Sequence, residues 1–218
     1  MEAPLPDRPS GGGSHTGLPL DVERELVRRM QAQDGDAFGA IYESYLPRLY
    51  RYCLARLRDP IEAEDAAEDI FVRVLSSIDR FTWRPMGADR SPFAAWIFRI
   101  AHNHLVSIYR RAAVRPGVGP LTETIADERR GPAELAERRS EIDEAFEAVE
   151  LLPEAQRDVV LLRFGAGLSV AETAAALNKN EGNVKVLQHK GIRRLREILA
   201  DENHPARRGA RSLKARRA

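Results

Sequence analysis

Apolar side chains recur along this chain at intervals of three and four residues from Pro19 onwards, which is the spacing of one face of an α-helix. Nowhere does the sequence show a convincing alternation of apolar and polar residues, the pattern of a half-buried β-strand. The pattern therefore predicts an all-α protein. The predicted helices span residues 20–33, 36–57, 60–78, 92–111, 134–150, 153–164, 169–177 and 181–199.

Residues suited to capping mark the starts of three of these helices. Asp59 and Ser91 each precede a proline. Proline lacks an N–H, and it is tolerated at the first helical position because an N–H there would have no partner inside the helix. Ser169 and Glu172 have the spacing of a capping box. Pro47 lies inside the second predicted helix, and it is expected to bend or break that helix because it lacks an N–H.

Composition divides the chain into two small helical domains joined by a flexible linker. Residues 112–132 contain three prolines and three glycines, which disfavour regular structure. The chain is expected to comprise a disordered tail (1–18), a first domain (19–111), a linker (112–139), a second domain (140–200) and a basic tail (201–218).

The overall composition excludes several classes of protein. Hydrophobic residues make up 43% of the 218, charged residues 31%, and the formal net charge is only +1. Cys53 is the single cysteine, so an intrachain disulfide and a cysteine-based zinc site are excluded. Neither a membrane-spanning run nor an apolar signal core occurs, and a soluble, cytoplasmic protein is expected.

Residues 169–199 have the length and turn chemistry of a helix-turn-helix, whose second helix enters the DNA major groove. Asn178 suits the turn because asparagine tolerates the left-handed conformation, and Asn180 can cap the second helix. Val184, Leu187, Gly191, Leu195 and Ile198 form the apolar stripe of that helix.

Polar residues of the same helix fall away from the apolar stripe. Lys185, Val186 and His189 are predicted to contact base edges. Contacts to the DNA backbone are expected from Asn183, Lys190, Arg193 and Arg194. The alternative is an ordinary solvated cationic face.

Two segments of the first domain carry unusual side chains. Five acidic residues occur within residues 62–69, ahead of an apolar run that includes Phe71. This pattern is typical either of a solvent-exposed helix face or of a binding surface for an arginine-rich partner protein. In the helix from Pro92, Trp96 and Arg99 suggest single-stranded DNA binding, in which bases stack on rings and cations hold phosphates, although such aromatics also occur in cores.

Catalytic chemistry is not indicated. His102 and His104 point nearly opposite ways on a helix, so they cannot chelate one metal ion, and they are expected to be surface groups or phosphate contacts. The sequence contains neither a glycine-rich phosphate loop nor a nucleophile motif nor paired carboxylates. We therefore predict a protein that is not an enzyme and that needs no metal or cofactor.

Three segments in order resemble the extracytoplasmic-function (ECF) subfamily of sigma-70 factors: EAEDAAEDIFVRVLSSIDRF, SPFAAWIFRIAHNHLVSIYRR and the stretch from LLPEAQRDVV to RRLREIL. The resemblance covers residues 20–111 and 140–199. It implies a region 2 domain that binds the polymerase and opens the −10 element, and a region 4 domain that reads the −35 element.

The resemblance also implies roles for individual residues. Those falling in the polymerase-binding helix are Glu64, Asp65, Glu68, Asp69 and Phe71. The −10 strand is expected to be captured by the loop before Ser91 and by five residues of the helix that follows: Trp96, Arg99, Asn103, Arg110 and Arg111. Those implied at the −35 element are Asn183, Lys185, Val186, His189, Lys190 and Arg193.

The partners implied are core RNA polymerase, through the β′ clamp helices and the β subunit, promoter DNA and an anti-sigma factor. Four positions depart from the family pattern: Glu68 replaces a common glutamine, Val186 and Leu187 stand where polar residues are frequent, and Asn178 replaces the usual turn glycine. The alternative function is a stand-alone helix-turn-helix regulator that does not bind the polymerase. That alternative leaves the acidic and the arginine-aromatic helices of the first domain unexplained.

Overall fold

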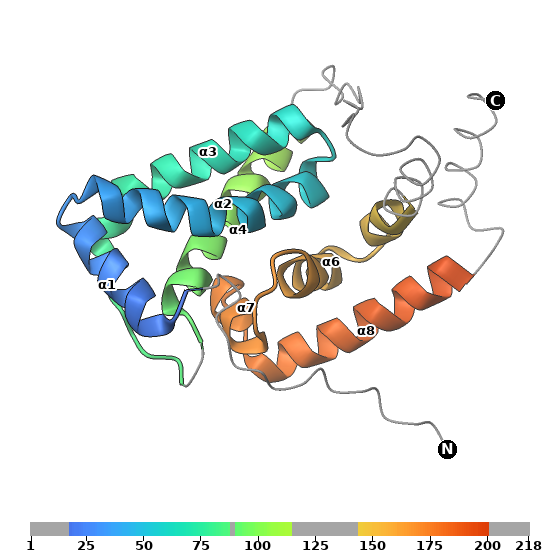
Figure 1. Cartoon of the computed structure of the whole chain (residues 1–218). Coiled ribbons are helices and arrows are strands. Elements are labelled where there is room, and N and C mark those ends of the chain that lie inside the picture. Colours follow the sequence, from blue (N-terminus) through green and yellow to red (C-terminus); the bar gives the residue numbers. More distant parts are fainter. Residues whose placement is uncertain (1–17, 88–89, 115–143, 201–218) are drawn as a thin grey trace, which may run out of the picture.

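The computed structural model describes residues 18–87, 90–114 and 144–200, and all regular elements within these ranges are helical, as predicted (Figure 1). The α-helices are α1 (Leu20–Gln31), α2 (Gly35–Leu57), α3 (Pro60–Ser77), α4 (Pro92–Val114), α6 (Glu154–Val160), α7 (Val170–Ala176) and α8 (Glu181–Ala200). A 3-10 turn, η1 (Ile78–Arg80), follows α3, a π-helical turn, η2 (Leu161–Gly165), continues α6, and residues 144–150 are also helical. The predicted tails and most of the predicted linker lie outside the described residues.

The predicted caps form. Asp59 accepts hydrogen bonds from the N–H groups of Ile61 and Glu62 at 2.8 and 2.9 Å, and Ser91 Oγ accepts one from Ala94 N–H at 2.8 Å. The capping box at the start of α7 is complete (Ser169 and Glu172). These bonds satisfy N–H groups that have no partner inside the helix.

The sequence predicted that Pro47 bends or breaks its helix; the helix does not break there, and α2 runs without interruption from Gly35 to Leu57 (Figure 1). A proline inside a helix costs about 3 kcal/mol. Packing offsets this cost, since α2 lies between α1, α3 and α4 and buries Ile41, Tyr45 and Leu49 completely.

A buried polar cluster joins α1, α2 and the start of α4. The carboxylate of Glu23, which is fully buried, accepts hydrogen bonds from Tyr45 Oη and Ser91 Oγ, both at 2.5 Å. Burial raises the pKa of Glu23, and the hydrogen bonds from Ser91 and Tyr45 oppose that rise. The cluster thereby fixes the position of Ser91, which caps α4.

His104 corrects the expectation of a surface group. It is only 4% exposed and lies on the side of α4 that faces α3, where its Nε2 is 3.5 Å from Asp69 Oδ2. Neither ring nitrogen has a hydrogen-bond partner. Burial, followed by the charge of Arg73, lowers the pKa of His104, so the folded protein favours the neutral ring.

Replacing His104 with leucine should therefore leave stability at pH 7 unchanged or raise it by about 1 kcal/mol, because two unsatisfied buried nitrogens disappear. In the wild type, stability should fall as the pH drops below the ordinary histidine value of about 6.5, because the unfolded chain then binds more protons than the folded one. Chemical denaturation between pH 7.5 and 5 should give a shallower slope for H104L. An unchanged slope contradicts the prediction.

In the C-terminal half, α6, α7 and α8 enclose a small core of Val159, Ala174 and Val184. Asn178 has a φ of 53°, the left-handed conformation predicted for the turn. Asn180 Oδ1 accepts a hydrogen bond from Asn183 N–H at 2.7 Å and so caps α8, also as predicted.

Gly191 lies where α8 packs tightly on α6. A Cβ atom at this position would lie 2.9 Å from Val160 Cγ2. G191A should therefore destabilise the fold by about 1–2 kcal/mol, despite the higher helix propensity of alanine. G182A is the matched control in the same helix, because the nearest atom to its Cβ lies at 3.4 Å, and it should be neutral or stabilising. Thermal melts of both variants test the prediction, which fails if G191A is as stable as G182A.

Candidate nucleic-acid interface

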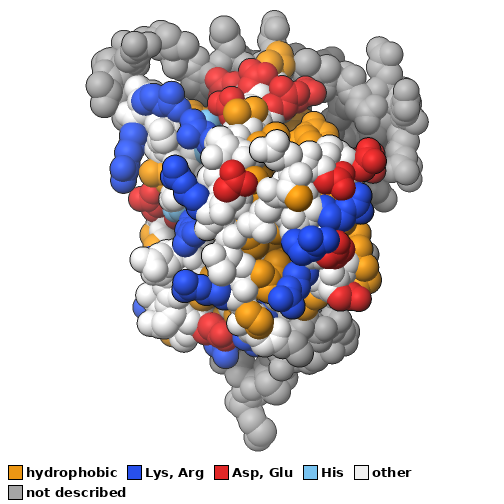
Figure 2. Space-filling model, turned by 90° about the vertical axis from the view of Figure 1, so that its left-hand side faces the viewer, with side chains coloured by type: hydrophobic (Ala, Val, Ile, Leu, Met, Phe, Trp, Pro, Cys, Tyr) orange, Lys and Arg blue, Asp and Glu red, His pale blue; other side chains and the backbone are white. Residues whose placement is uncertain are grey.

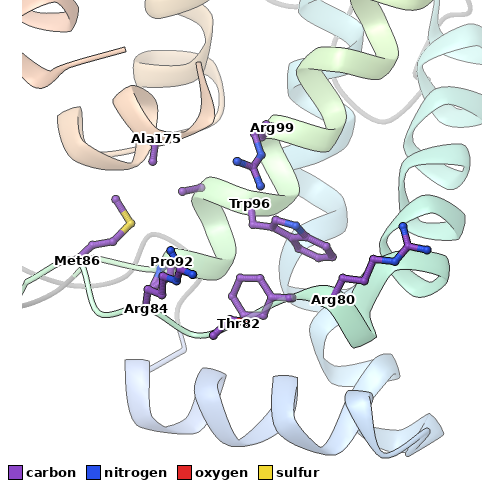
Figure 3. A pocket seen from close by; sticks show the side chains of 10 residues that line it. Arg80, Thr82, Arg84, Met86, Pro92, Trp96, Arg99 and Ala175 are labelled. Atoms are coloured by element: carbon purple, nitrogen blue, oxygen red, sulfur yellow. The ribbon is translucent and has the colours of Figure 1, made fainter. Parts of the chain in front are cut away.

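A cavity of about 390 Å³ opens between the start of α4 and the loop that follows η1 (Figure 3). Trp96 and Arg99 line it from α4, and Arg80, Thr82 and Arg84 line it from the opposite side. Its volume lies within the range of sites that hold small molecules, about 300–1,000 Å³. The structure thus brings Trp96 and Arg99 together with the loop, which the sequence placed near them.

The aromatic rings at this cavity form a connected group. Phe81 lies at the centre, with ring centroids 5.0 Å from Trp96, 5.6 Å from Phe93 and 6.3 Å from Trp83. Phe81 and Phe93 are buried, whereas Trp96 is only partly buried. The buried rings therefore support Trp96 from behind and leave part of the indole available for stacking.

Three arginines (Arg80, Arg84 and Arg99) line the same cavity as the Trp96 ring, and all three are exposed. A partly exposed aromatic ring among cations is the chemistry with which proteins bind single-stranded nucleic acid. A base can stack on the indole while the guanidinium groups contact the flanking phosphates. We define Arg80, Phe81, Arg84, Trp96 and Arg99 as the α4 pocket.

Sequence reasoning named the loop but missed Arg80, Phe81, Thr82, Arg84 and Met86 as individual lining residues. The available signal was the alternation of arginine and aromatic side chains from residue 80 to residue 84.

The other residues proposed for the −10 strand lie farther along α4. Asn103 is exposed and lines a second hollow, of about 350 Å³, together with Arg73, Ser76 and Ser107. Arg110 and Arg111 are exposed near the end of the helix. They do not line the α4 pocket, so any contact they make would be with a different part of the nucleic acid.

The acidic cluster lies on the outer side of α3. Glu64, Asp65, Glu68 and Asp69 are all exposed, and so are the apolar side chains of Ile61, Val72 and Leu75. On the face of the molecule shown in Figure 2, acidic and basic side chains both occur around exposed apolar ones. An exposed helix with acidic and apolar residues is suited to a protein partner.

Phe71 is a correction to the proposed polymerase-binding set. It is 2% exposed and packs on the rings of Tyr42, at 4.6 Å, and Phe38, at 6.2 Å. Its side chain lies on the apolar face of α3, which packs against α2. Phe71 therefore supports the acidic surface from inside and does not form part of it.

The outer face of α8 presents the residues predicted for the −35 element. Val184, Gly191 and Ile198 are buried, whereas the predicted residues are all exposed: Asn183, Lys185, Val186, His189, Lys190 and Arg193. Val186, the apolar member of this set, is 51% exposed. Arg193 pairs with Glu197 at 3.7 Å on the surface.

The fold and these surfaces define a DNA-binding protein of two helical halves, one with a helix-turn-helix and one with an arginine-aromatic pocket. Comparison with known families agrees: residues 41–115 match sigma-70 region 2, and residues 148–197 match sigma-70 region 4.

The chain is 37% identical over 180 residues to the ECF RNA polymerase sigma factor BldN of Streptomyces coelicolor. The matched region covers 82% of this chain and 66% of BldN. It is 33% identical over 183 residues to the ECF sigma factor SigD of Mycobacterium tuberculosis, covering 80% of this chain and 83% of SigD. The chain belongs to the ECF subfamily of the sigma-70 family and is an RNA polymerase sigma factor. Sigma factors are non-enzymatic transcription initiation factors.

Solved structures share the fold. CnrH in complex with the cytosolic domain of CnrY matches with a TM-score of 0.63 and 22% identity, over 83% of this chain and 98% of that one. RpoE of Bartonella quintana, in complex with the anti-sigma factor NepR, matches with a TM-score of 0.58 and 24% identity, over 76% and 98% of the two chains. Among the helices that the structure describes, none is long and apolar enough to cross a membrane.

Proposed function

We propose that this chain binds core RNA polymerase through α3, captures the −10 element as single-stranded DNA in the α4 pocket, and reads the duplex −35 element with α8. The polymerase performs the chemistry of RNA synthesis, and the chain itself needs no catalytic group, metal or cofactor. Its place of action is the cytoplasm, where the polymerase and the promoter are.

The observation that carries this proposal is the combination of two different DNA surfaces in one chain. The α4 pocket offers a partly exposed indole and three arginines, which suit unpaired bases. The outer face of α8 offers cations and an exposed valine on a helix of the size that fits the major groove. A promoter that is melted at one element and double-stranded at the other needs both surfaces.

Run-off transcription tests the proposal. Purified chain, core polymerase and a library of random −35 and −10 sequences should yield transcripts from a selected promoter. A stand-alone regulator would instead bind duplex DNA in the absence of polymerase and yield no transcript, which would favour the alternative function.

An anti-sigma factor is the regulatory partner that we propose. The sigma factor RpoE, which shares the fold, was solved with an anti-sigma factor. Affinity purification of the chain from its source cells tests this: a stoichiometric partner that is not a polymerase subunit, and that blocks polymerase binding when added back, is expected, and recovery of polymerase subunits alone would contradict it.

Replacing Lys185 with alanine should weaken −35 recognition by about 1–3 kcal/mol and relax the base preference at one position if this side chain contacts a base edge. K190A is the matched control in the same exposed helix, because a phosphate contact should weaken binding evenly across sequences. Binding of promoter variants at fixed salt distinguishes the two. If K185A weakens binding equally on every promoter variant, the assignment of Lys185 to a base contact is contradicted.

A further inference from the structure

Polar side chains surround a hollow of about 350 Å³ that lies between α3 and α4 and shares no lining residue with the α4 pocket. Three of them come from α3 (Arg73, Ser76 and Ser77) and three from α4 (Asn103, His104 and Ser107), and Ile100 completes the lining. The volume lies within the range of small-molecule sites, about 300–1,000 Å³. We call this site the α3–α4 hollow.

His104 is the residue that indicates a ligand. It is 4% exposed, and neither of its ring nitrogens has a hydrogen-bond partner among the described residues. Folded proteins pair nearly all of their buried polar atoms, because an unpaired one has lost its hydration without compensation. The ring lines the α3–α4 hollow, so an oxygen atom of a ligand bound there can accept a hydrogen bond from it.

The charges that act on the His104 ring favour an anion. They are those of Arg73 and Asp69 from α3 and of Arg111 from α4. Arg73 is exposed, and no ion pair joins it to another described residue. Arg111 Nε donates to the carbonyl oxygen of Ser107 at 3.2 Å, which holds this guanidinium group beside a lining residue. Two guanidinium groups against one carboxylate leave the hollow with a net positive charge.

The donor groups are those with which proteins contact phosphate oxygens, namely arginine, serine and asparagine side chains. Ser76 Oγ and Ser77 Oγ donate to the carbonyl oxygen of Arg73 at 3.0 and 2.5 Å, and each hydroxyl hydrogen can rotate towards a bound oxygen. A metal ion does not suit the hollow, because the described ranges contain no group of three or more His, Cys, Asp or Glu side chains that could hold one.

We propose that the α3–α4 hollow binds a phosphate group, which Arg73 of α3 and His104 of α4 hold together. Asn103 and Ser107 supply further donors from α4. The phosphate group belongs either to a free phosphate ester or to a DNA backbone, and both sources present the same oxygens. The free-ligand form stands without the proposed function, whereas the DNA form extends that function to a second part of the nucleic acid.

Proton uptake should accompany binding. Burial, followed by the charge of Arg73, holds the pKa of His104 below its ordinary value, and Asp69 opposes this effect. An anion beside the ring favours its charged form, so the pKa of His104 should rise in the complex. A ligand that raises the pKa of a group binds more tightly as the pH falls towards that pKa. Sulfate, which keeps its charge over this range, is the probe for this effect.

Free anions test the site first. The full chain is titrated with sodium phosphate and, separately, with sodium sulfate, and sodium chloride holds the ionic strength constant. The imidazole carbon and proton signals of His104, assigned by their absence in H104L, should shift saturably with either anion. Sulfate should bind at least about threefold more tightly at pH 6 than at pH 7.5 in the wild type, and H104L should lose this dependence.

R73Q tests the cation, and R51Q is its matched control. Both arginines are exposed, but Arg51 lies on α2 and outside the α3–α4 hollow. R73Q should bind phosphate at least about fivefold more weakly than the wild type, whereas R51Q should bind it as the wild type does. Circular dichroism confirms that both variants are folded.

DNA with single uncharged phosphates separates the two sources. The chain bound to core polymerase is titrated with −10 promoter fragments that each carry one methylphosphonate. If DNA supplies the phosphate group, one substitution should weaken binding by the wild type at least about threefold and leave R73Q unaffected. If a free ester supplies it, R73Q should bind every fragment as the wild type does, while phosphate still shifts the His104 signals.

Three results would overturn the phosphate site. The first is the absence of any saturable shift with phosphate or sulfate, together with no effect of R73Q on DNA binding. The second is an equal loss in R73Q and R51Q, which would indicate a general response to charge. The third is an unchanged pH dependence of sulfate binding in H104L. Failure of run-off transcription would contradict the proposed function, and the free-anion titrations would still test the hollow.

Discussion

Reversing the charge of Asp65 and Glu68 to lysine is expected to weaken binding to core RNA polymerase by at least about 100-fold, because like charges at an interface cost several kcal/mol. Both side chains are exposed on α3, so the fold should tolerate the change. Asp69 is left in place because it lies 3.5 Å from His104 and helps to enclose that buried ring. Binding is measured by titrating labelled chain with core polymerase at fixed salt.

The control for this experiment is D21K/E43K, which changes the net charge equally on α1 and α2 and should bind polymerase as the wild type does. Circular dichroism confirms that both variants are folded. If D65K/E68K binds polymerase as tightly as D21K/E43K, the acidic surface of α3 is not the docking site. Duplex DNA binding by α8 should be the same in both.

Replacing Trp96 with alanine is expected to reduce promoter opening by about 5–150-fold, because stacking of one base on an aromatic ring contributes about 1–3 kcal/mol. Trp96 also packs on Phe81 and Phe93, so W96A should lose some stability as well. W96F separates the two effects, since it keeps a stacking face over the same rings. Fluorescence of 2-aminopurine placed in the −10 element reports opening directly.

Trp83 offers the matched comparison. It is the only other tryptophan in the chain, and it contacts Phe81 but does not line the α4 pocket. W83A should therefore retain opening when polymerase is saturating. An equal loss in W83A and W96A would indicate that both act through the stability of the aromatic group, and base stacking on Trp96 would then be rejected.

Local features of the fold could be predicted because neighbouring residues determine them. Asp59, Ser91 and Ser169 cap helices because their side chains reach N–H groups two or three positions away. Asn178 adopts the turn conformation through its own backbone preference. The outward face of α8 follows from a period of 3.6 residues, which divides a helix into buried and exposed sides wherever its partner lies.

Burial across helices could not be predicted in the same way. His104 follows the polar Asn103, and Phe71 begins an apolar run directly after the acidic cluster. Only the packing of α4 on α3 and of α3 on α2 shows that both rings are buried. Pro47 remains in a continuous helix because contacts with three other helices offset its local cost. The α4 pocket likewise depends on how the loop after η1 folds back over α4, which depends on contacts remote in sequence.

The sequence by itself determined that the chain is helical, that it carries a helix-turn-helix with a cationic outer face, and that an acidic helix and an arginine-aromatic helix precede it. Only the tertiary structure decided how the two halves meet. Ser91 and Glu172 are 81 positions apart, and Arg56 and Asp158 are 102 apart. Periodicity and propensity act over a few residues, whereas pairings at such separations depend on the packing of the whole chain.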